Sequence, residues 1–148
     1  MKILIMIPAY NEELNIERVV NNLADNFPQY DYVVINDGSK DDTAKICRQN
    51  GFHLIDLPIN LGLSGAVQAG MRYAWQNGYD AAIQIDGDGQ HRPEYIEQLA
   101  KELEKGEAQI VIGSRFVTEK KPRSLRMLGS NVISGLIRLS TGFRLNDP

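Results

Sequence analysis

The sequence predicts an α/β protein whose mainly parallel sheet is covered by helices on both faces. Apolar runs rich in Ile and Val recur along the chain, and each run is too short to be a helix. The runs do not alternate with polar residues, which is typical of strands buried on both faces. Segments with helical start signals lie between them, and this alternation favours parallel strands joined by crossover helices.

The apolar runs give the predicted strands: residues 3–8, 32–36, 53–57, 81–85 and 110–112. Helix start signals stand after the first, second and fourth runs. They are Asn11 followed by Glu12 and Glu13, Ser39 with Asp42 three residues on, and Pro93 followed by Glu94. Another helix is expected to end near Trp75. Residues 124–139 also read as a helix, because apolar residues recur there at intervals of three and four.

Length and composition indicate one globular domain. The chain has 148 residues, of which 43% are apolar and 24% charged, and these values are ordinary for a folded protein. The net charge of −3 is unevenly spread, since residues 114–148 carry seven Lys and Arg against Glu119 and Asp147, a net +5 that leaves −8 on residues 1–113. The basic stretch predicts either a solvated face or a site for an anion or an anionic membrane surface.

Cysteine content and hydropathy predict a cytoplasmic protein. The single cysteine, Cys47, has no partner for an intramolecular disulfide, and Met1 and Lys2 lead into an apolar strand without a signal cleavage site. No apolar run approaches the ~18 residues that cross a bilayer. We therefore expect the cytoplasm, at the inner face of the membrane if the basic stretch binds lipid, and no nucleic-acid partner.

The loop after the fourth predicted strand carries the candidate metal ligands. Ligands of open parallel sheets lie beyond the carboxyl ends of the strands, and Asp86-Gly87-Asp88 stands at such an end. Gly87 permits the turn that brings both carboxylates toward one ion. Oxygen ligands of this kind suit Mg²⁺ or Mn²⁺. The alternative is a surface turn in which Asp and Gly supply only turn geometry.

Two other loops offer candidate binding residues. Asp37 follows the second strand, where its carboxylate can accept hydrogen bonds from a nucleobase or ribose, while capping of the next helix explains Ser39. Residues 60–65, which include Gly62, offer a backbone surface that directs helix N–H groups at an anion.

Competing motifs fit the chain less well. A calcium loop of the EF-hand type needs glycine where His91 stands and a helix before it. The dinucleotide pattern Gly-x-Gly-x-x-Gly belongs directly after the first strand, where this chain has Pro8-Ala9-Tyr10-Asn11-Glu12. A sugar-phosphate nucleotidyltransferase would carry a glycine-rich basic loop at that same position.

Several short motifs in a fixed order closely resemble glycosyltransferase family 2, in particular the branch of dolichyl-phosphate mannosyltransferases and bacterial polyprenyl-phosphate glycosyltransferases. They are Ile7-Pro8-Ala9-Tyr10-Asn11-Glu12, Asn36-Asp37-Gly38-Ser39, Asn60-Leu61-Gly62, Asp86-Gly87-Asp88-Gly89-Gln90 with Pro93-Glu94, and Gly113-Ser114-Arg115. Each motif alone is weakly specific, whereas the ordered set is highly specific and runs from residue 3 to the end of the chain.

The resemblance implies a nucleotide-diphospho-sugar transferase fold of the GT-A type. Residues 1–113 would form the donor and metal part, and residues 114–148 would begin the acceptor-binding part. The residues implied to bind the nucleotide sugar are Pro8, Ala9, Tyr10, Glu12, Asp37, Gly62, Asp86 and Gly87. The implied metal ligands are Asp86, Asp88 and Gln90, and the implied catalytic residues are Asp88, Arg115 and Asp147. Arg115 would face the donor diphosphate or the acceptor phosphate.

The chain departs from the family pattern at two places. The family commonly has Asp where this chain has Asn36, a change that keeps hydrogen bonding and that we expect to be tolerated. The last residues, 141–148, are similar to the opening of the family segment Gly-x-x-x-x-Asp-Pro-Thr-Ser-Gly-Phe-Arg, so we expect the sequence to be cut before its serine and arginine.

The resemblance implies an inverting transfer of a hexose from a GDP- or UDP-sugar to an acceptor. A polyprenyl phosphate acceptor is largely ionised near neutral pH, because the second pKa of a phosphate monoester is about 6, and it needs little deprotonation. A saccharide hydroxyl would require a carboxylate base, for which Asp147 is the candidate in the basic stretch. A non-catalytic nucleotide-sugar-binding domain stays an alternative.

Overall fold

The computed structural model describes residues 1–88 and 95–113, and Met1–Gln109 form one compact unit. Strands and helices alternate along it as predicted. The elements are β1 (Ile3–Ala9), α1 (Ile16–Asn26), β2 (Asp31–Asn36), α2 (Thr43–Gln49), β3 (Leu54–Asp56), α3 (Gly62–Gln76), β4 (Ala81–Gln84) and α4 (Ile96–Glu104). The predicted α/β class is confirmed.

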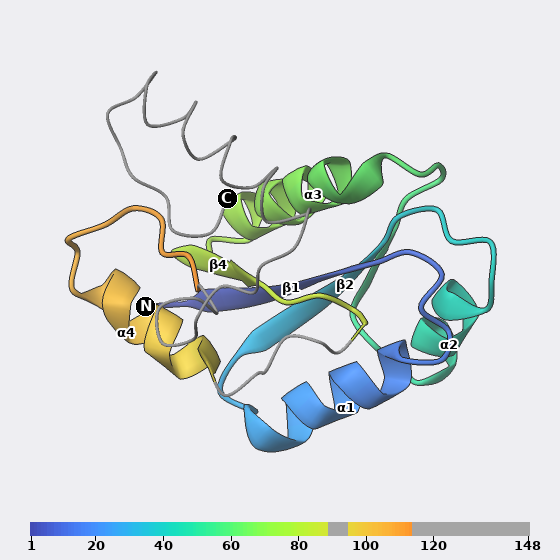
Figure 1. Ribbon diagram of the computed structural model, residues 1–148, viewed down its shortest axis with the longest axis horizontal. Coiled ribbons are helices and arrows are strands. Elements are labelled where there is room, and N and C mark those ends of the chain that lie inside the picture. The colour runs from blue at the N-terminus through green and yellow to red at the C-terminus, as the bar shows by residue number, and fades with distance from the viewer. Residues whose placement is uncertain (89–94, 114–148) are drawn as a thin grey trace, which may run out of the picture. The chain divides into compact units, whose positions relative to one another are not determined.

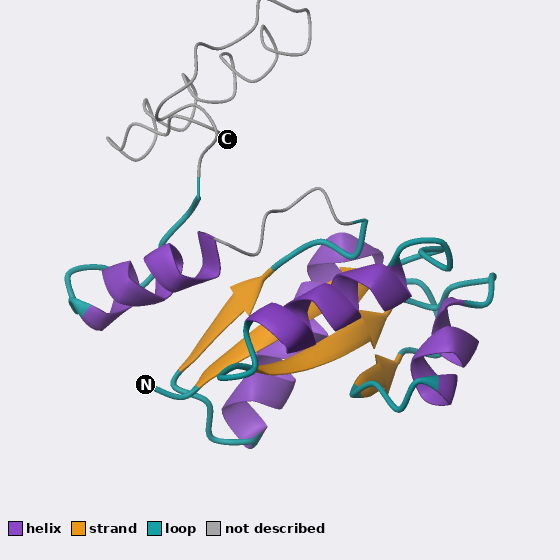
Figure 2. Ribbon diagram, turned by 90° about the horizontal axis from the view of Figure 1, so that it is seen from below, coloured by secondary structure: helices purple, strands orange, loops and turns teal. Residues whose placement is uncertain are grey.

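The described strands form one parallel sheet with the order β3-β2-β1-β4, in which Figure 1 labels β2, β1 and β4. The chain steps outward from β1 to β2 and β3, and then returns past β1 to form β4. Crossovers between parallel strands are right-handed, so reversing the direction of travel moves the connecting helix to the other face. The sheet consequently has helices on both faces, as Figure 2 shows.

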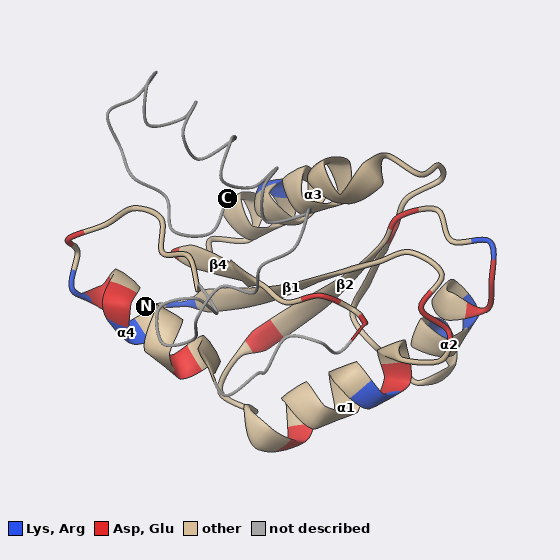
Figure 3. Cartoon of the chain, viewed as in Figure 1, with Lys and Arg blue, Asp and Glu red and all other residues tan. Residues whose placement is uncertain are grey.

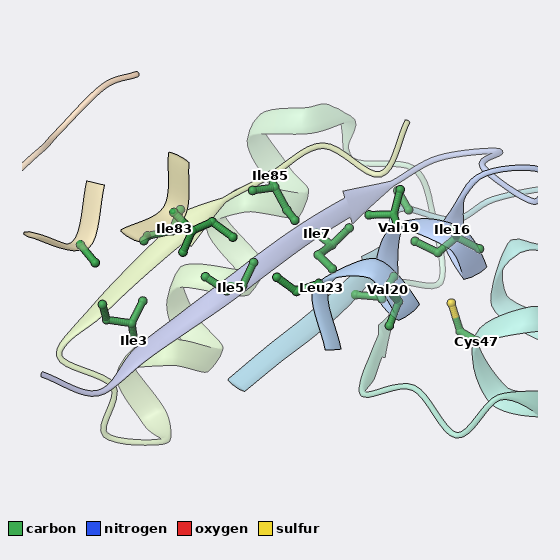
Figure 4. Packing of buried hydrophobic residues seen from close by; sticks show 14 residues of the cluster. Ile3, Ile5, Ile7, Ile16, Val19, Val20, Leu23, Cys47, Ile83 and Ile85 are labelled. Carbon is green, nitrogen blue, oxygen red and sulfur yellow. The ribbon is translucent and has the colours of Figure 1, made fainter. Parts of the chain in front are cut away.

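One face of the sheet packs against α1, α2 and α4. Alternate residues of β1 point to this face, and α1 meets them with apolar residues at intervals of three and four (Figure 4). The cluster includes Ile3, Ile5, Ile7, Ile16, Val19, Val20, Leu23 and Cys47. Cys47 is fully buried in this core, and its burial raises the pKa of the thiol to about 11.

The opposite face packs against α3 through small residues. Ala66, Gly70 and Ala74 recur every fourth position and are buried in the helix face toward the sheet. A Cβ atom on Gly70 would lie 2.7 Å from the Met6 sulfur, which is closer than van der Waals contact allows. The absence of a side chain at this position therefore sets how near α3 approaches β1.

The predicted strand at residues 110–112 is wrong for the structure. This segment has no regular secondary structure, and Ile110 and Ile112 are 78% and 68% exposed. A strand requires a pairing partner, and no ladder among the described residues includes this segment. The predicted helix at residues 124–139 lies outside the described residues.

Two helices begin later than their start signals predict. Helix α1 begins at Ile16, because Asn11 has a left-handed φ of 57° that no helix continues, and a turn at Glu12 follows. Helix α2 begins at Thr43, so Ser39 does not cap it. The Ser39 hydroxyl instead accepts a hydrogen bond from the Asn11 N–H.

Candidate functional site

The order of the strands places β1 between β2 and β4, with the carboxyl ends of all three at one edge of the parallel sheet. In open parallel sheets, ligands bind beyond the carboxyl ends of the strands. Pro8 and Ala9 close β1 at this edge, and Asp86 follows β4. The sheet topology therefore brings two of the predicted motifs, far apart in sequence, to the same place.

The Asp86-Gly87-Asp88 turn is hydrogen-bonded to the end of β1. The Gly87 N–H donates to the Pro8 carbonyl at 3.2 Å, and the preceding Ile85 N–H donates to the Met6 carbonyl at 3.0 Å. A Cβ atom on Gly87 would lie 3.0 Å from the Pro8 carbonyl oxygen and 3.3 Å from the Ala9 Cβ. A side chain at this position would therefore be crowded, because the turn lies directly against β1.

Gln84 orients one of the candidate metal ligands. Its side-chain amide donates to Asp86 Oδ1 at 3.0 Å from the last residue of β4. Asp86 and Asp88 are both partly buried. The sequence interpretation missed Gln84, although a long polar residue between Ile83 and Ile85 in an otherwise apolar run is a signal that could have identified it.

Asp37 reaches the site edge from β2, on the other side of β1. Its N–H donates to the Ala9 carbonyl at 2.9 Å, and its side chain is only 3% exposed. Asp37 Oδ1 accepts the Leu61 N–H at 2.7 Å, and within the described ranges no hydrogen-bond donor reaches Oδ2. The carboxylate therefore joins the end of β2 to the loop before α3.

Gly38 makes that contact sterically feasible. It has a φ of +64°, and a Cβ atom there would lie 2.6 Å from the Asn60 nitrogen. The Gly62 N–H already has the Asn60 side-chain oxygen as an acceptor at 3.1 Å. Two N–H groups at the start of α3, those of Leu61 and Gly62, thus bind protein side chains.

Tyr10 and Glu12 follow β1 in the loop toward α1. Tyr10 is 43% exposed, whereas Glu12 is partly buried and accepts a hydrogen bond from the Asn15 amide at 2.9 Å. Gln90, Arg115 and Asp147 lie outside the described residues. Among the predicted site residues in the described ranges, Asp37 and Gly87 donate backbone hydrogen bonds to the end of β1.

The edge formed by these loops is strongly acidic. Figure 3 shows acidic residues, in red, along the loops that follow β1, β2 and β4. They are Glu12, Glu13, Asp37, Asp41, Asp42, Asp86 and Asp88, with Lys40 as a basic residue among them. Within residues 1–88 and 95–113 no group of three or more His, Cys, Asp and Glu side chains gathers around one point. Any ion held by Asp86 and Asp88 would consequently need further ligands from water, substrate or residues outside these ranges.

Comparison with known proteins decides the family. The family model for glycosyl transferase family 2 matches residues 4–145, almost the whole chain. The chain belongs to glycosyltransferase family 2. The resemblance drawn from the ordered motifs is therefore confirmed.

Two similar proteins have names that specify a polyprenyl substrate or product. Undecaprenyl-phosphate mannosyltransferase of Micrococcus luteus is 33% identical over 99% of this chain and 63% of its own length. Polyprenol monophosphomannose synthase of Mycolicibacterium smegmatis is 32% identical over 77% of this chain and 45% of its own length. The chain thus spans less than two thirds of the length of these relatives.

Solved structures similar to this one are GT-A glycosyltransferases. Glucosyl-3-phosphoglycerate synthase of Mycobacterium tuberculosis in complex with UDP matches 97% of this chain and 53% of its own, with a TM-score of 0.68 and 22% identity. The same synthase with Mn²⁺, UDP-glucose and phosphoglyceric acid matches 72% of this chain and 40% of its own, with a TM-score of 0.57 and 25% identity. The GT-A fold class is confirmed. In the described part of this chain, no helix is long and apolar enough to cross a bilayer.

Proposed function

We propose that this chain forms the donor-binding part of an inverting glycosyltransferase that moves a hexose from a nucleotide-diphosphate sugar to polyprenyl phosphate. The observation that carries the proposal is the Asp86-Gly87-Asp88 turn, which is hydrogen-bonded to the end of β1, with Asp37 at the end of the neighbouring strand β2. The names of the similar transferases from Micrococcus and Mycolicibacterium support the lipid-phosphate acceptor.

Asp86 and Asp88, with Gln90, would hold Mg²⁺ or Mn²⁺. Their oxygen atoms suit these ions, and Gln84 fixes the orientation of Asp86 as an outer-shell partner would. When bound, the ion supplies positive charge for the leaving diphosphate. The acidic edge supports this assignment, because a donor diphosphate would otherwise meet carboxylates of its own sign. A similar synthase was crystallised with Mn²⁺ and UDP-glucose.

The protein residues would act mainly by binding and orienting the two substrates. Asp37 and the exposed Tyr10 would contact the nucleoside, beside the Pro8–Ala9 strand end. We further propose that Arg115 binds a phosphate group and that Asp147 serves as base only if the acceptor is a hydroxyl. A polyprenyl phosphate, already ionised near neutral pH, would attack the sugar without a protein base.

Metal-dependent nucleotide binding is the first test. In titration calorimetry, UDP or GDP should bind at least about tenfold more tightly with Mn²⁺ than in chelator, a difference of about 1.4 kcal/mol. Asp88→Asn should abolish the gain. Asp25→Asn, an equal charge change at an exposed position of α1, is the matched control and should keep it. Equal affinity with and without metal in the wild type would refute the metal site.

Acceptor choice is the second test. The full-length protein should transfer hexose to undecaprenyl phosphate or dolichyl phosphate in detergent, and inversion should appear in the anomeric configuration of the product. Binding of anionic liposomes at low salt, lost at high salt, would support a position at a membrane surface. Nucleotide-sugar binding without transfer to any acceptor would favour a binding domain, and transfer to a saccharide would refute the lipid acceptor.

A further inference from the structure

Reciprocal hydrogen bonds join the loop after β1 to the loop after β2. The Asn11 N–H donates to the Ser39 hydroxyl at 2.9 Å, and the Asn11 side-chain oxygen accepts the Lys40 N–H at 2.9 Å. These partners are 28 and 29 residues apart in sequence. We call the contact of Asn11 with Ser39 and Lys40 the interloop clasp.

A second set of hydrogen bonds continues the contact toward the helices. They run from the Glu12 N–H to the Thr43 hydroxyl, from the Glu13 N–H to Asp41, and from the Asp42 N–H to the Glu13 carboxylate. Partial desolvation raises the pKa of Asp41, but hydrogen bonds from Thr43 and Glu13 outweigh it and hold this pKa below its ordinary value. The two loops are therefore held together along their length.

Asn11 meets two demands that few residues combine. Its φ of 57° is left-handed, a conformation that Asn and Gly adopt more readily than most residues. Its side chain must also present an oxygen to the Lys40 N–H. Glycine satisfies only the first demand, whereas aspartate satisfies both. The two demands can therefore be separated by substitution.

The residues expected to contact the nucleoside, Tyr10 and Asp37, lie next to the interloop clasp in sequence. Tyr10 lies between Ala9 and Asn11, and Asp37 lies two residues before Ser39. The backbones are joined on the near side by the Asp37 N–H to the Ala9 carbonyl and on the far side by the clasp. With both sides fixed, the distance between Tyr10 and Asp37 is set by hydrogen bonds that exist before any ligand binds.

We propose that Asn11 and Ser39 are positioning residues that hold Tyr10 and Asp37 at the spacing needed for the donor nucleoside. The inference rests on the proposed function, because it takes the pocket to bind a nucleotide sugar. A preformed pocket avoids the cost of ordering two loops on binding. The clasp is distant in sequence from Asp86 and Asp88 and acts on the nucleoside. Its loss raises the Kd and KM for the donor and leaves kcat unchanged.

Nucleoside monophosphate binding isolates this effect from the metal. The probes are UMP and GMP, titrated in chelator into the full-length protein well below its unfolding temperature. Asn11→Gly and Ser39→Ala should each weaken binding about tenfold, which equals about 1.4 kcal/mol and lies within the range for one lost hydrogen bond. Asn11→Asp and Ser39→Thr keep the acceptor oxygen and should bind like wild type. The double variant should bind about as weakly as either single variant, because each opens the same clasp.

The outcomes separate the clasp from the donor site. If Asn11→Gly lowers the Tm but leaves the monophosphate Kd and the donor KM unchanged, the contact is structural only and the positioning role is overturned. A fall in kcat at unchanged KM would overturn it as well. If the wild type binds neither UMP nor GMP, the donor site and the positioning role both fall.

Discussion

The family commonly has aspartate at position 36, and we expect Asn36→Asp to destabilise this chain. Asn36 is 2% exposed at the end of β2, and its side-chain amide donates to Asp56 Oδ1 at 2.6 Å. The two residues are register partners in β2 and β3, and Arg48 pairs with the other oxygen of Asp56. An aspartate at position 36 would therefore place a second carboxylate against the first.

The expected cost follows from this contact. A hydrogen bond to a charged group contributes about 1.5–3 kcal/mol, and its donor is lost. Two charges 4 Å apart repel by about 4 kcal/mol at an effective dielectric constant of 20. Protonation of one carboxyl limits this repulsion, since the pair raises one pKa. We expect a loss of about 2–4 kcal/mol in the free energy of unfolding near pH 7.

The loss should depend on pH in a defined direction. In the folded variant one carboxyl would have a pKa above its unfolded value of about 3.9, so the folded state binds more protons. The free energy of unfolding of the variant, relative to that of the wild type, should then be highest below about pH 4 and fall as the pH rises through the raised pKa. Urea unfolding of wild type and Asn36→Asp at pH 4.5 and pH 7 measures this.

A paired exchange provides the control for this prediction. Asn36→Asp combined with Asp56→Asn restores one amide and one carboxylate at the contact, with the charge moved to β2. The combined variant should recover most of the lost stability at pH 7. The reasoning is refuted if Asn36→Asp unfolds within about 0.5 kcal/mol of wild type at pH 7, the range of a neutral surface change.

Three further substitutions test the packing and the pH response. Gly87→Ala should weaken metal-dependent UDP or GDP binding in calorimetry while the protein stays folded, because its Cβ would meet the Pro8 carbonyl at 3.0 Å. Gly70→Ala should lower the free energy of unfolding by about 1–3 kcal/mol in urea titration, because overpacking against Met6 exceeds any gain in helix propensity. Burial raises the pKa of Tyr79 to about 12, so the folded state holds this proton more tightly than the unfolded state. The stabilisation from the neutral phenol is therefore complete below pH 10 and is lost as the pH rises toward 12. Tyr79→Phe should therefore lose less stability than wild type over that range in urea titrations.

The sequence by itself determined the strands, the acidic turn and the family. Continuous apolar runs marked β1, β2, β3 and β4 because buried parallel strands are apolar on both faces. The Asp86-Gly87-Asp88 turn was predicted as a candidate site because two carboxylates at a strand end offer oxygen atoms that suit a divalent ion. The ordered motifs then identified the family, since several weak local patterns in one order are together specific.

Only the tertiary structure decided how distant segments meet. Three contacts join residues that no local pattern connects. They are the Asn36–Asp56 hydrogen bond, the interloop clasp, and the hydrogen bond from the Gly87 N–H to the Pro8 carbonyl. The same reason explains the error at residues 110–112, where an apolar run suited to a strand finds no partner in the described sheet. Strand pairing and side-chain contacts depend on which elements become neighbours, and that depends on the strand order and the crossovers of the whole sheet.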